Sequence, residues 1–369
     1  MSRIIRISLS LRMVVACLAI LMVLVLAGTL YQVEYGLYAA QQKYFYSWFV
    51  LLFGFIPFPG TQLTLSVLFI NLTASMLFHF RLGWRQAGIV LIHLGLMLLL
   101  TGGWVTHQFG EESFLSLTEG EASNVSSDYR EWEISVAKTR DPDREVVGID
   151  LRSLHAGTTF VVEGTGIEVE VEEQYAHCRA FRAEKEADAE PLLNVSGIAE
   201  LKAAPENRDP EANIPGLVLR VKRGGTSAGL LLFGGDMLET ELPGADGPCY
   251  FSLRRKRYPL PVSVRLLDFE RTVHPGSSTP KSFSSQVELG PVEREVTIEM
   301  NKPLRIKGYT FFQASFQNLE SGAELSTFAV TRNYGRLIPY IATGVTVAGL
   351  AYHFIAVLVL AAPGRKAAA

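Results

Sequence analysis

The chain has 369 residues, of which 48% are hydrophobic and 19% charged, and its net charge at pH 7 is −3. The charge is divided unevenly, because only one of the 37 acidic and eight of the 34 basic residues lie outside residues 108–337. That block therefore carries a net charge of −10. Its acidity argues against nucleic acid as a partner, since such binding needs a basic surface that displaces counterions.

Four long segments of the chain are apolar and almost uncharged: Leu11–Tyr31, Thr64–Phe80, Gln86–Val105 and Ile338–Ala362. Each approaches the ~20 residues that a helix needs to cross a bilayer. We therefore expect an α+β membrane protein. Residues 1–107 would hold three transmembrane helices, residues 108–337 a large polar domain, and residues 338–369 the fourth helix with a short tail.

The orientation follows from basic residues that flank these segments. They precede the first segment, separate the second from the third, and follow the fourth: Arg3, Arg6 and Arg12, then Arg81 and Arg85, then Arg365 and Lys366. The positive-inside rule makes that side cytoplasmic and places the polar domain outside, in a periplasm-like compartment. We expect the first segment to be an uncleaved anchor; a cleaved signal peptide is the alternative.

The loop at residues 32–60 is rich in aromatic residues, because all residues of Tyr44–Phe49 except Ser47 are aromatic. Its apolar run Trp48–Ile56 is too short to cross a bilayer, and Pro57–Gly60 ends it. This pattern predicts an interfacial or re-entrant segment with aromatic side chains at headgroup depth. The alternative is a helix end that dips into the interface.

The polar domain has the sequence pattern of β-strands. Alternation of apolar and polar residues predicts strands at residues 131–137, 166–172, 217–221, 262–266, 295–300 and 309–314. Turn signals separate them, among them Pro243-Gly244 and His274-Pro275-Gly276. Residues 183–190 and 203–214 are charged and read as surface excursions. We expect a β-rich sandwich or barrel-like domain between the third and fourth helices.

The membrane histidines are the first candidate site residues. His93 lies inside the apolar run Ala87–Leu100, where an ionisable group is costly and is a functional candidate by default. On ideal helices, His93 and His353 lie ~10 Å and ~14 Å from the cytoplasmic ends. Two such imidazoles can bind the two faces of one haem, or one axial position each of different haems. Helix packing is the alternative for both.

His107 follows His93 by 14 residues, so the two share one helix face about 21 Å apart. It either faces a haem edge at the outer boundary or simply meets water. The polar domain also contains three isolated histidines without metal-ligand spacing: His155, His177 and His274. Hydrolase and phosphate-binding motifs are absent from the sequence.

Three cysteines do not form a disulfide framework. Cys17 lies in the first apolar segment, whereas Cys178 and Cys249 lie in the polar domain. One disulfide between the last two is compatible with an oxidising compartment, but their spacing does not decide it. A Cys-x-x-Cys motif is absent, so we expect no thiol–disulfide relay in this chain.

The last third of the polar domain carries a distinctive succession of segments: Val264–Glu270, Pro280–Val287, Ile298–Leu304 and Lys307–Phe316. Its centre reads N-x-P-L followed by G-Y-x-x-F-Q-x-S-F. This succession resembles the ResB family of system II cytochrome c biogenesis proteins, and Leu117–Glu121 resembles the family's segment after its third span. The specific motif covers about residues 264–316. The chain is short for the family and lacks a cysteine expected near the end of the second span.

The resemblance implies a subunit of the bacterial cytoplasmic membrane that works with a CcsA/ResC-type protein. Such a pair carries haem b across the membrane and presents it to apocytochrome c, so we expect no enzyme activity from this chain alone. The resemblance also implies an intramembrane haem with a histidine ligand, for which His93 matches best by position. A b-type electron carrier, with haem held between His93 and His353, and a haem-free structural subunit are the alternatives.

Overall fold

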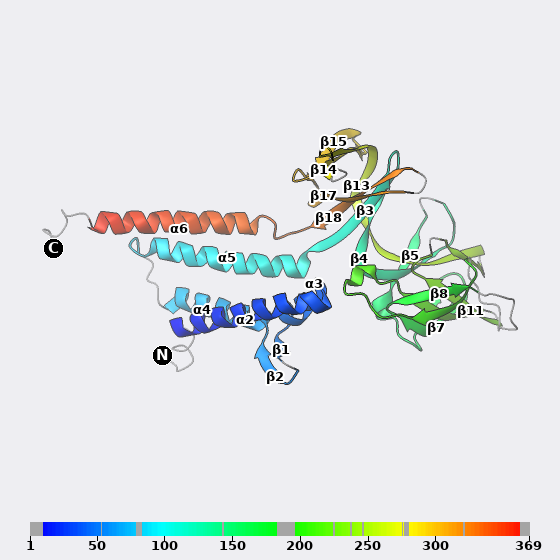
Figure 1. Cartoon of the computed structure of the whole chain (residues 1–369), viewed down its shortest axis with the longest axis horizontal. Helices are drawn as coiled ribbons and strands as arrows, with labels where there is room; N and C mark the ends of the chain where they lie inside the picture. The colour runs from blue at the N-terminus through cyan, green and yellow to red at the C-terminus, as the bar shows by residue number, and fades with distance from the viewer. Residues whose placement is uncertain are drawn as a thin grey trace. The chain divides into compact units, whose positions relative to one another are not determined.

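The computed structural model describes residues 10–52, 54–78, 83–141, 144–182, 196–223, 226–236, 238–245, 247–274, 276, 280–319 and 322–361. The chain divides into two compact units. The helical unit comprises residues 1–111 and 332–369, and the β unit comprises residues 112–331. Figure 1 shows the long helices of the first unit and the strands of the second.

Four long helices form most of the helical unit: α2 (Leu11–Tyr35), α4 (Thr61–Phe78), α5 (Ala87–Phe109) and α6 (Ile338–Ala361). All four are long and apolar enough to cross a membrane. They coincide with the predicted apolar segments, although α2 and α5 continue four residues beyond the predicted ends. The predicted ends at Phe80 and Ala362 lie outside the described residues. Four such helices and a large β-rich unit fit the predicted α+β membrane protein.

Between α2 and α4 the chain folds back in short elements: α3 (Leu37–Ala40), the π-helix η1 (Gln41–Phe45), and a hairpin of β1 (Phe49–Leu52) and β2 (Ile56–Pro59). Gly28 of α2 permits close approach, because a Cβ there would lie 2.9 Å from the Phe45 ring. The apolar run predicted as interfacial or re-entrant is thus a β-hairpin. Pro57 and Pro59 lack the N–H groups that a helix interior needs.

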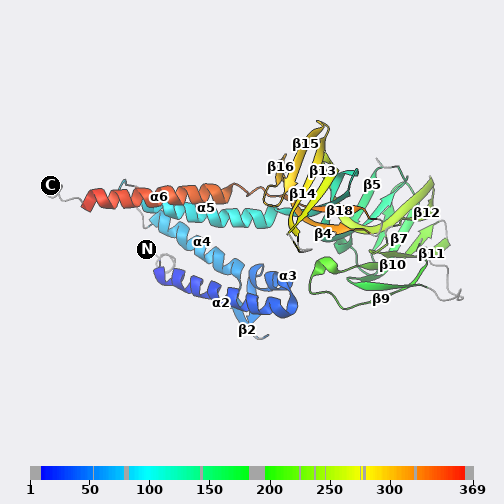
Figure 2. The ribbon, with the colours of Figure 1, turned by 45° about the horizontal axis from the view of Figure 1, so that its top comes forward.

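Three glycines spaced seven residues apart bring α5 against α6. A Cβ at Gly88 would lie 2.7 Å from the His353 backbone nitrogen, and one at Gly95 would overlap Thr346. Gly102 likewise packs on α6. Seven residues turn a helix by about 700°, close to two full turns, so the glycines form one stripe. Small residues allow this close approach of membrane helices, and Figure 2 shows the two helices side by side.

The β unit contains sixteen named strands among its described residues: β3 (Glu111–Thr118), β4 (Ala122–Ala137), β5 (Val146–Asp150), β6 (Thr159–Val162), β7 (Ile167–Tyr175), β8 (Cys178–Arg182), β9 (Ile198–Ala203), β10 (Gly216–Arg223), β11 (Thr226–Phe233), β12 (Thr240–Gly244), β13 (Gly247–Val273), β14 (Pro280–Gly290), β15 (Arg294–Glu299), β16 (Leu304–Ile306), β17 (Tyr309–Asn318) and β18 (Glu324–Arg332). Two short 3₁₀ helices, η2 (Leu151–Ser153) and η3 (Pro210–Ala212), interrupt them. All six predicted segments lie within observed strands, which they overrun by at most one residue, although β4 and β13 are much longer than predicted.

Two long strands, β4 and β13, connect two cores. The part of this strand pair in which Tyr250 lies opposite Ala137 packs against a four-stranded sheet of order β11-β10-β7-β6. The apolar side chains between these layers form a sandwich core that includes Ile134, Phe251 and Leu219. Strand alternation produces this core, because every second residue of each strand points inward.

The other part of the large sheet curls toward a barrel. Its strand order is β15-β14-β13-β4-β3-β18-β17-β16, and β14 and β15 come back into contact with β16 and β17. The enclosed side chains, among them Leu117, Val264, Phe311 and Phe328, form a second core. The β unit therefore combines the two forms predicted for it, a sandwich and a barrel-like sheet.

One turn and two surface segments were also predicted for the β unit, and their outcomes differ. Pro243-Gly244, predicted as a turn, ends β12, because both residues pair with β13. The segment at residues 183–190 lies outside the described residues. The segment at residues 203–214 is ordered by side-chain bonds, since the Asn207 N–H donates to the Asn213 side-chain oxygen at 2.8 Å.

Candidate functional site

His93 lies in the second turn of α5 and is half-buried. Its Nδ1 lies 2.9 Å from the Ile89 carbonyl oxygen. A carbonyl oxygen only accepts hydrogen bonds, so Nδ1 carries the proton in this arrangement. The neutral ring then has its lone pair on Nε2. Iron-binding histidines are commonly held in this way, with one nitrogen donating to a backbone carbonyl.

His93 faces away from α6. It follows Gly88 by five residues, which places it about 140° around the helix from that glycine. The glycine stripe is the side of α5 that α6 covers. The face that carries His93 is therefore left to other parts of the helical unit or to a partner.

His353 occupies a different setting on α6. Its own backbone forms the contact with Gly88. The Nδ1 atom is buried and has no hydrogen-bond partner among the described residues. The structure therefore does not bring His93 and His353 to one face. Close backbone packing at Gly88 also leaves no room for a porphyrin between the two helices at this level.

His107 shares the face of His93 to within about 40°, and its position in the last turn of α5 is exposed. Its ring stacks on Tyr46, with the ring centres 4.3 Å apart and an interplanar angle of 20°. Other aromatic rings gather nearby in the chain, where Tyr31 stacks on Tyr35 and Lys43 lies over the Tyr31 ring at 4.1 Å. This arrangement is typical of the aromatic belt at a membrane interface.

Asn71 on α4 is a polar residue that the pattern analysis did not single out. It is buried, and its side-chain amide donates to the Ser10 carbonyl oxygen at 3.5 Å. Asn71 precedes the described end of α4 by seven residues, and His93 follows the start of α5 by six. Each of the two residues thus lies about 10 Å along its helix from the end that leads into the connection between α4 and α5. An isolated amide within an apolar run was the sequence signal for it.

Histidines of this kind fit a haem better than a metal ion held by side chains alone. Among the described residues, no group of three or more histidine, cysteine, aspartate or glutamate side chains is arranged to hold a metal ion. Haem iron takes its equatorial ligands from the porphyrin and needs one or two protein side chains. His93 fits the position of one axial ligand, and its own chain places no second histidine on the same level and face among the described residues.

The motif in the last third of the chain has a structural part in the barrel. Asn301 adopts a positive φ of 64° at the turn after β15, a conformation that asparagine tolerates well. Gln313 of β17 donates to the Ser326 hydroxyl at 3.0 Å and accepts from the Ser285 hydroxyl at 2.7 Å. Ser285 and Ser326 are fully buried. These bonds connect β14, β17 and β18 across the interior of the curled sheet.

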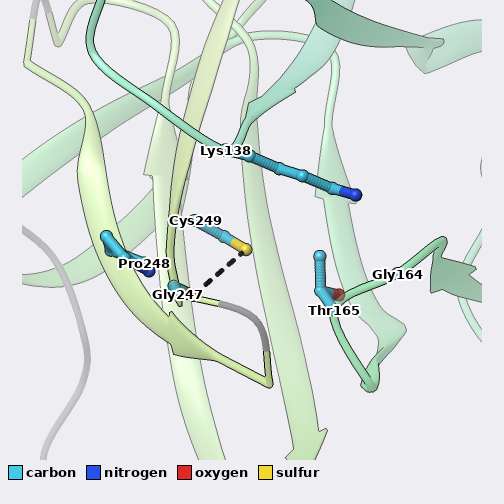
Figure 3. Close-up of a pocket in the computed structure, with 6 residues that line it drawn as sticks. All are labelled: Lys138, Gly164, Thr165, Gly247, Pro248 and Cys249. Atoms are coloured by element: carbon cyan, nitrogen blue, oxygen red, sulfur yellow. Dashed lines mark hydrogen bonds between the residues drawn. The ribbon is translucent and has the colours of Figure 1, made fainter.

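The β unit also has a small pocket, drawn in Figure 3. Lys138, Thr165 and Cys249 are among the residues around its cavity of about 20 Å³, which holds about one water molecule. The Cys249 thiol is directed to the Gly247 carbonyl oxygen, 4.0 Å away. A pocket of this size does not accommodate a cofactor.

Comparison with known proteins agrees with the motif. Residues 246–337 match the ResB-like family. Over 299 residues the chain is 24% identical to Protein NrfI of Wolinella succinogenes, an alignment that covers 79% of this chain and 30% of the relative. The chain thus spans about 30% of that relative's length. The matched family segment contains Asn301 at the turn after β15 and Gln313, which bonds to β14 and β18 inside the curled sheet. By these similarities the chain resembles ResB-like proteins, most specifically over residues 246–337.

Proposed function

We propose that this chain is the ResB-like subunit of a haem-delivery complex in the bacterial cytoplasmic membrane. Together with a CcsA/ResC-type membrane protein, it moves haem b from the cytoplasmic side to the periplasmic face and presents it to apocytochrome c. The observation that carries this proposal is His93, which stands within an apolar helix with its Nδ1 bonded to a backbone carbonyl. The family similarity supplies the context.

In this proposal His93 binds the haem iron through Nε2 on the face of α5 opposite α6. Haem supplies the group to be attached, and the thiols that receive it belong to apocytochrome c. The chain holds and orients the haem, excludes water around it with apolar helices, and offers the β unit to partner proteins. Any second protein ligand would come from outside the α5–α6 pair, because His353 lies on a different face.

Two membrane histidines also suggest a b-type electron carrier with one haem between His93 and His353. The packing of α5 on α6 does not favour this function. The glycine stripe brings the two backbones together where a porphyrin would have to lie. A His107 ligand at the outer end stays an open prediction of the haem proposal.

The proposed function is tested by the haem content of the complex. The full chain, purified together with its CcsA/ResC-type partner, is expected to show a Soret band in the absorbance spectrum. His93→Ala is expected to lose most of that absorbance, because an axial ligand is removed. His353→Ala serves as the matched control on the neighbouring helix and is expected to keep it. Absence of a Soret band in the wild-type complex would overturn the proposal, and an unchanged band in His93→Ala would remove His93 from the site.

A further inference from the structure

Within the part of the chain that the structure describes, β1 pairs only with β2, so its other edge is open. The Gly60 N–H donates to the Trp48 carbonyl oxygen at 2.8 Å, which fixes the phase of the ladder. In an antiparallel pair, residues alternate between those that bond across the ladder and those whose polar groups point outward. Phe49 and Leu51 are of the second kind. Their backbone N–H and C=O groups therefore point away from β2.

The opposite edge of the hairpin is closed by prolines. Pro59 pairs with Phe49 and Pro57 pairs with Leu51. These are the positions where β2 would direct N–H groups outward, and proline has none to direct. Proline is one of the residues that protect an edge strand from pairing. The hairpin is thus protected on β2 and left able to donate hydrogen bonds on β1.

The side chains on this edge are apolar and exposed. Phe49 is 67% exposed and Leu51 55%, and Phe55 in the turn after β1 is 73% exposed. The other face of the hairpin is covered, since Val50 is buried in one cluster with Leu24 of α2. The hairpin therefore presents apolar side chains on one face and outward N–H groups along the adjoining β1 edge.

The cluster with Leu24 places the hairpin beside the middle of a membrane helix. Leu24 is about 16 Å along α2 from Tyr35 at its outer end. At that depth acyl chains offer no hydrogen-bond acceptor, so exposed backbone is found only where protein or an aqueous cavity covers it. A lipid surface accommodates the apolar side chains but leaves the N–H groups of Phe49 and Leu51 without acceptors.

We propose that the open edge of β1 docks a transmembrane segment of a second membrane protein, which places oxygen acceptors opposite Phe49 and Leu51. This inference rests on the proposed function, which supplies a CcsA/ResC-type protein as the partner. The length of the relative is consistent with a partner protein, because 70% of Protein NrfI lies outside the segment similar to this chain. In that relative, a ResB-like region is therefore joined to a much longer polypeptide.

Photo-crosslinking tests the docking edge in the full-length complex. A photoreactive amino acid replaces Leu51 in one variant and Leu358 of α6, which is also exposed, in the control. Both are co-expressed with the CcsA/ResC-type protein and irradiated in the membrane. We expect a cross-link from position 51 to the partner and none from position 358. Cross-links from position 51 only to lipid, or only to a second copy of this chain, would overturn the proposal.

A pair of substitutions separates the backbone bond from the side chain. Leu51→Ala removes the side chain and keeps the N–H, whereas Leu51→Pro removes both without touching the ladder to β2. We expect Leu51→Pro to recover on the order of tenfold less partner than Leu51→Ala, because a donor in hydrocarbon loses its acceptor. Equal recovery would mean that the edge makes no backbone bond to the partner, which contradicts the proposal.

The same preparations keep this inference apart from the proposed function. A wild-type complex that contains partner and haem, but cross-links from position 51 to lipid alone, refutes the docking edge and leaves haem delivery standing. A wild-type complex with partner cross-links and no haem refutes haem delivery and leaves the docking edge standing. If no partner is recovered with the wild-type chain, both are refuted.

Discussion

Asp150 shows how the charges of the acidic β unit are held at the level of single residues. It accepts hydrogen bonds from the Arg152 backbone N–H at 2.9 Å and from the Lys256 ammonium at 3.1 Å. Partial burial raises the pKa of the Asp150 carboxyl, but these two donors outweigh burial, and the net pKa lies below its ordinary 3.8. Many acidic residues of this unit are paired in the same way, for example Glu133 with Arg254.

Replacing Asp150 is expected to weaken the β unit at neutral pH and progressively less in acid. The lowered pKa means that the carboxylate stabilises the fold above pH 3.8, and that this contribution is lost as the pH falls through the lower folded value. Asp150→Asn should lower the Tm of the detergent-solubilised protein by about 1–3 °C at pH 7, as expected for a partly exposed ion pair.

The control for this prediction is Glu163→Gln, which alters an exposed carboxylate in the same unit. Glu163→Gln should leave the Tm unchanged both at pH 7 and below pH 4. A Tm deficit of Asp150→Asn that grows below pH 4 would contradict the assigned sign.

The cysteines of the β unit are expected to be unreactive while it is folded. Burial raises the pKa of the Cys178 thiol to about 11, so almost none is thiolate at pH 8. Cys249 is also buried, and the two thiols lie in separate clusters and are not joined in a disulfide. Iodoacetamide at pH 8 should modify both only after denaturation, as measured by mass spectrometry. A disulfide-linked peptide containing both cysteines would contradict the structure.

At the scale of elements, the α5–α6 pair depends on the glycine stripe. Gly88→Val should disrupt the pair, because a side chain there meets the His353 backbone, which has no flexible end to move aside. Overpacking of this kind costs about 1–3 kcal/mol. Gly103→Val is the matched control on the same helix, since nothing lies within 4 Å of its Cβ position.

The measurement is the yield and thermal stability of each variant in detergent. We expect a lower yield and a lower Tm for Gly88→Val, and values near wild type for Gly103→Val. Similar losses in the two variants would show that helix propensity, and not the contact with α6, explains the effect.

The elements themselves were predictable where a short-range pattern determines them. The apolar runs set the four helices, and alternation set strands such as β7 and β10. The β1–β2 hairpin escaped prediction, because Trp48–Ile56 reads as one apolar run and only the register pairs Leu51 with Pro57. The curling of the large sheet also depends on contacts between distant strands, such as those of Gln313 and Ser285, that no local pattern specifies.

The candidate site was predictable in part. An ionisable side chain in an apolar run singled out His93, and the 14-residue spacing placed His107 on the same face. The separation of His93 from His353 was not expected, because depth alone does not determine which face a residue takes. The glycines at Gly88, Gly95 and Gly102 carried that information in their seven-residue spacing, since the face they form is the one that a neighbouring helix covers.

At the scale of the whole molecule, the proposed topology puts both chain ends in the cytoplasm and the β unit outside. Green fluorescent protein fused after the last residue should fluoresce, because it folds in the cytoplasm. Alkaline phosphatase inserted between residues 236 and 238 should be active, because it needs the periplasm. The reverse pattern would contradict the orientation drawn from the flanking arginines.

The contact between Gly88 and the His353 backbone also fixes how α5 is turned about its own axis. If His93 binds haem as proposed, its side chain must point in a fixed direction. A rotation of α5 by 100°, the angle of one residue, would point His93 elsewhere. Because the neighbouring helix holds the glycine stripe, α5 cannot make that turn without separating from α6. The glycine stripe on one side of α5 thus determines the direction in which the His93 imidazole points on the opposite side.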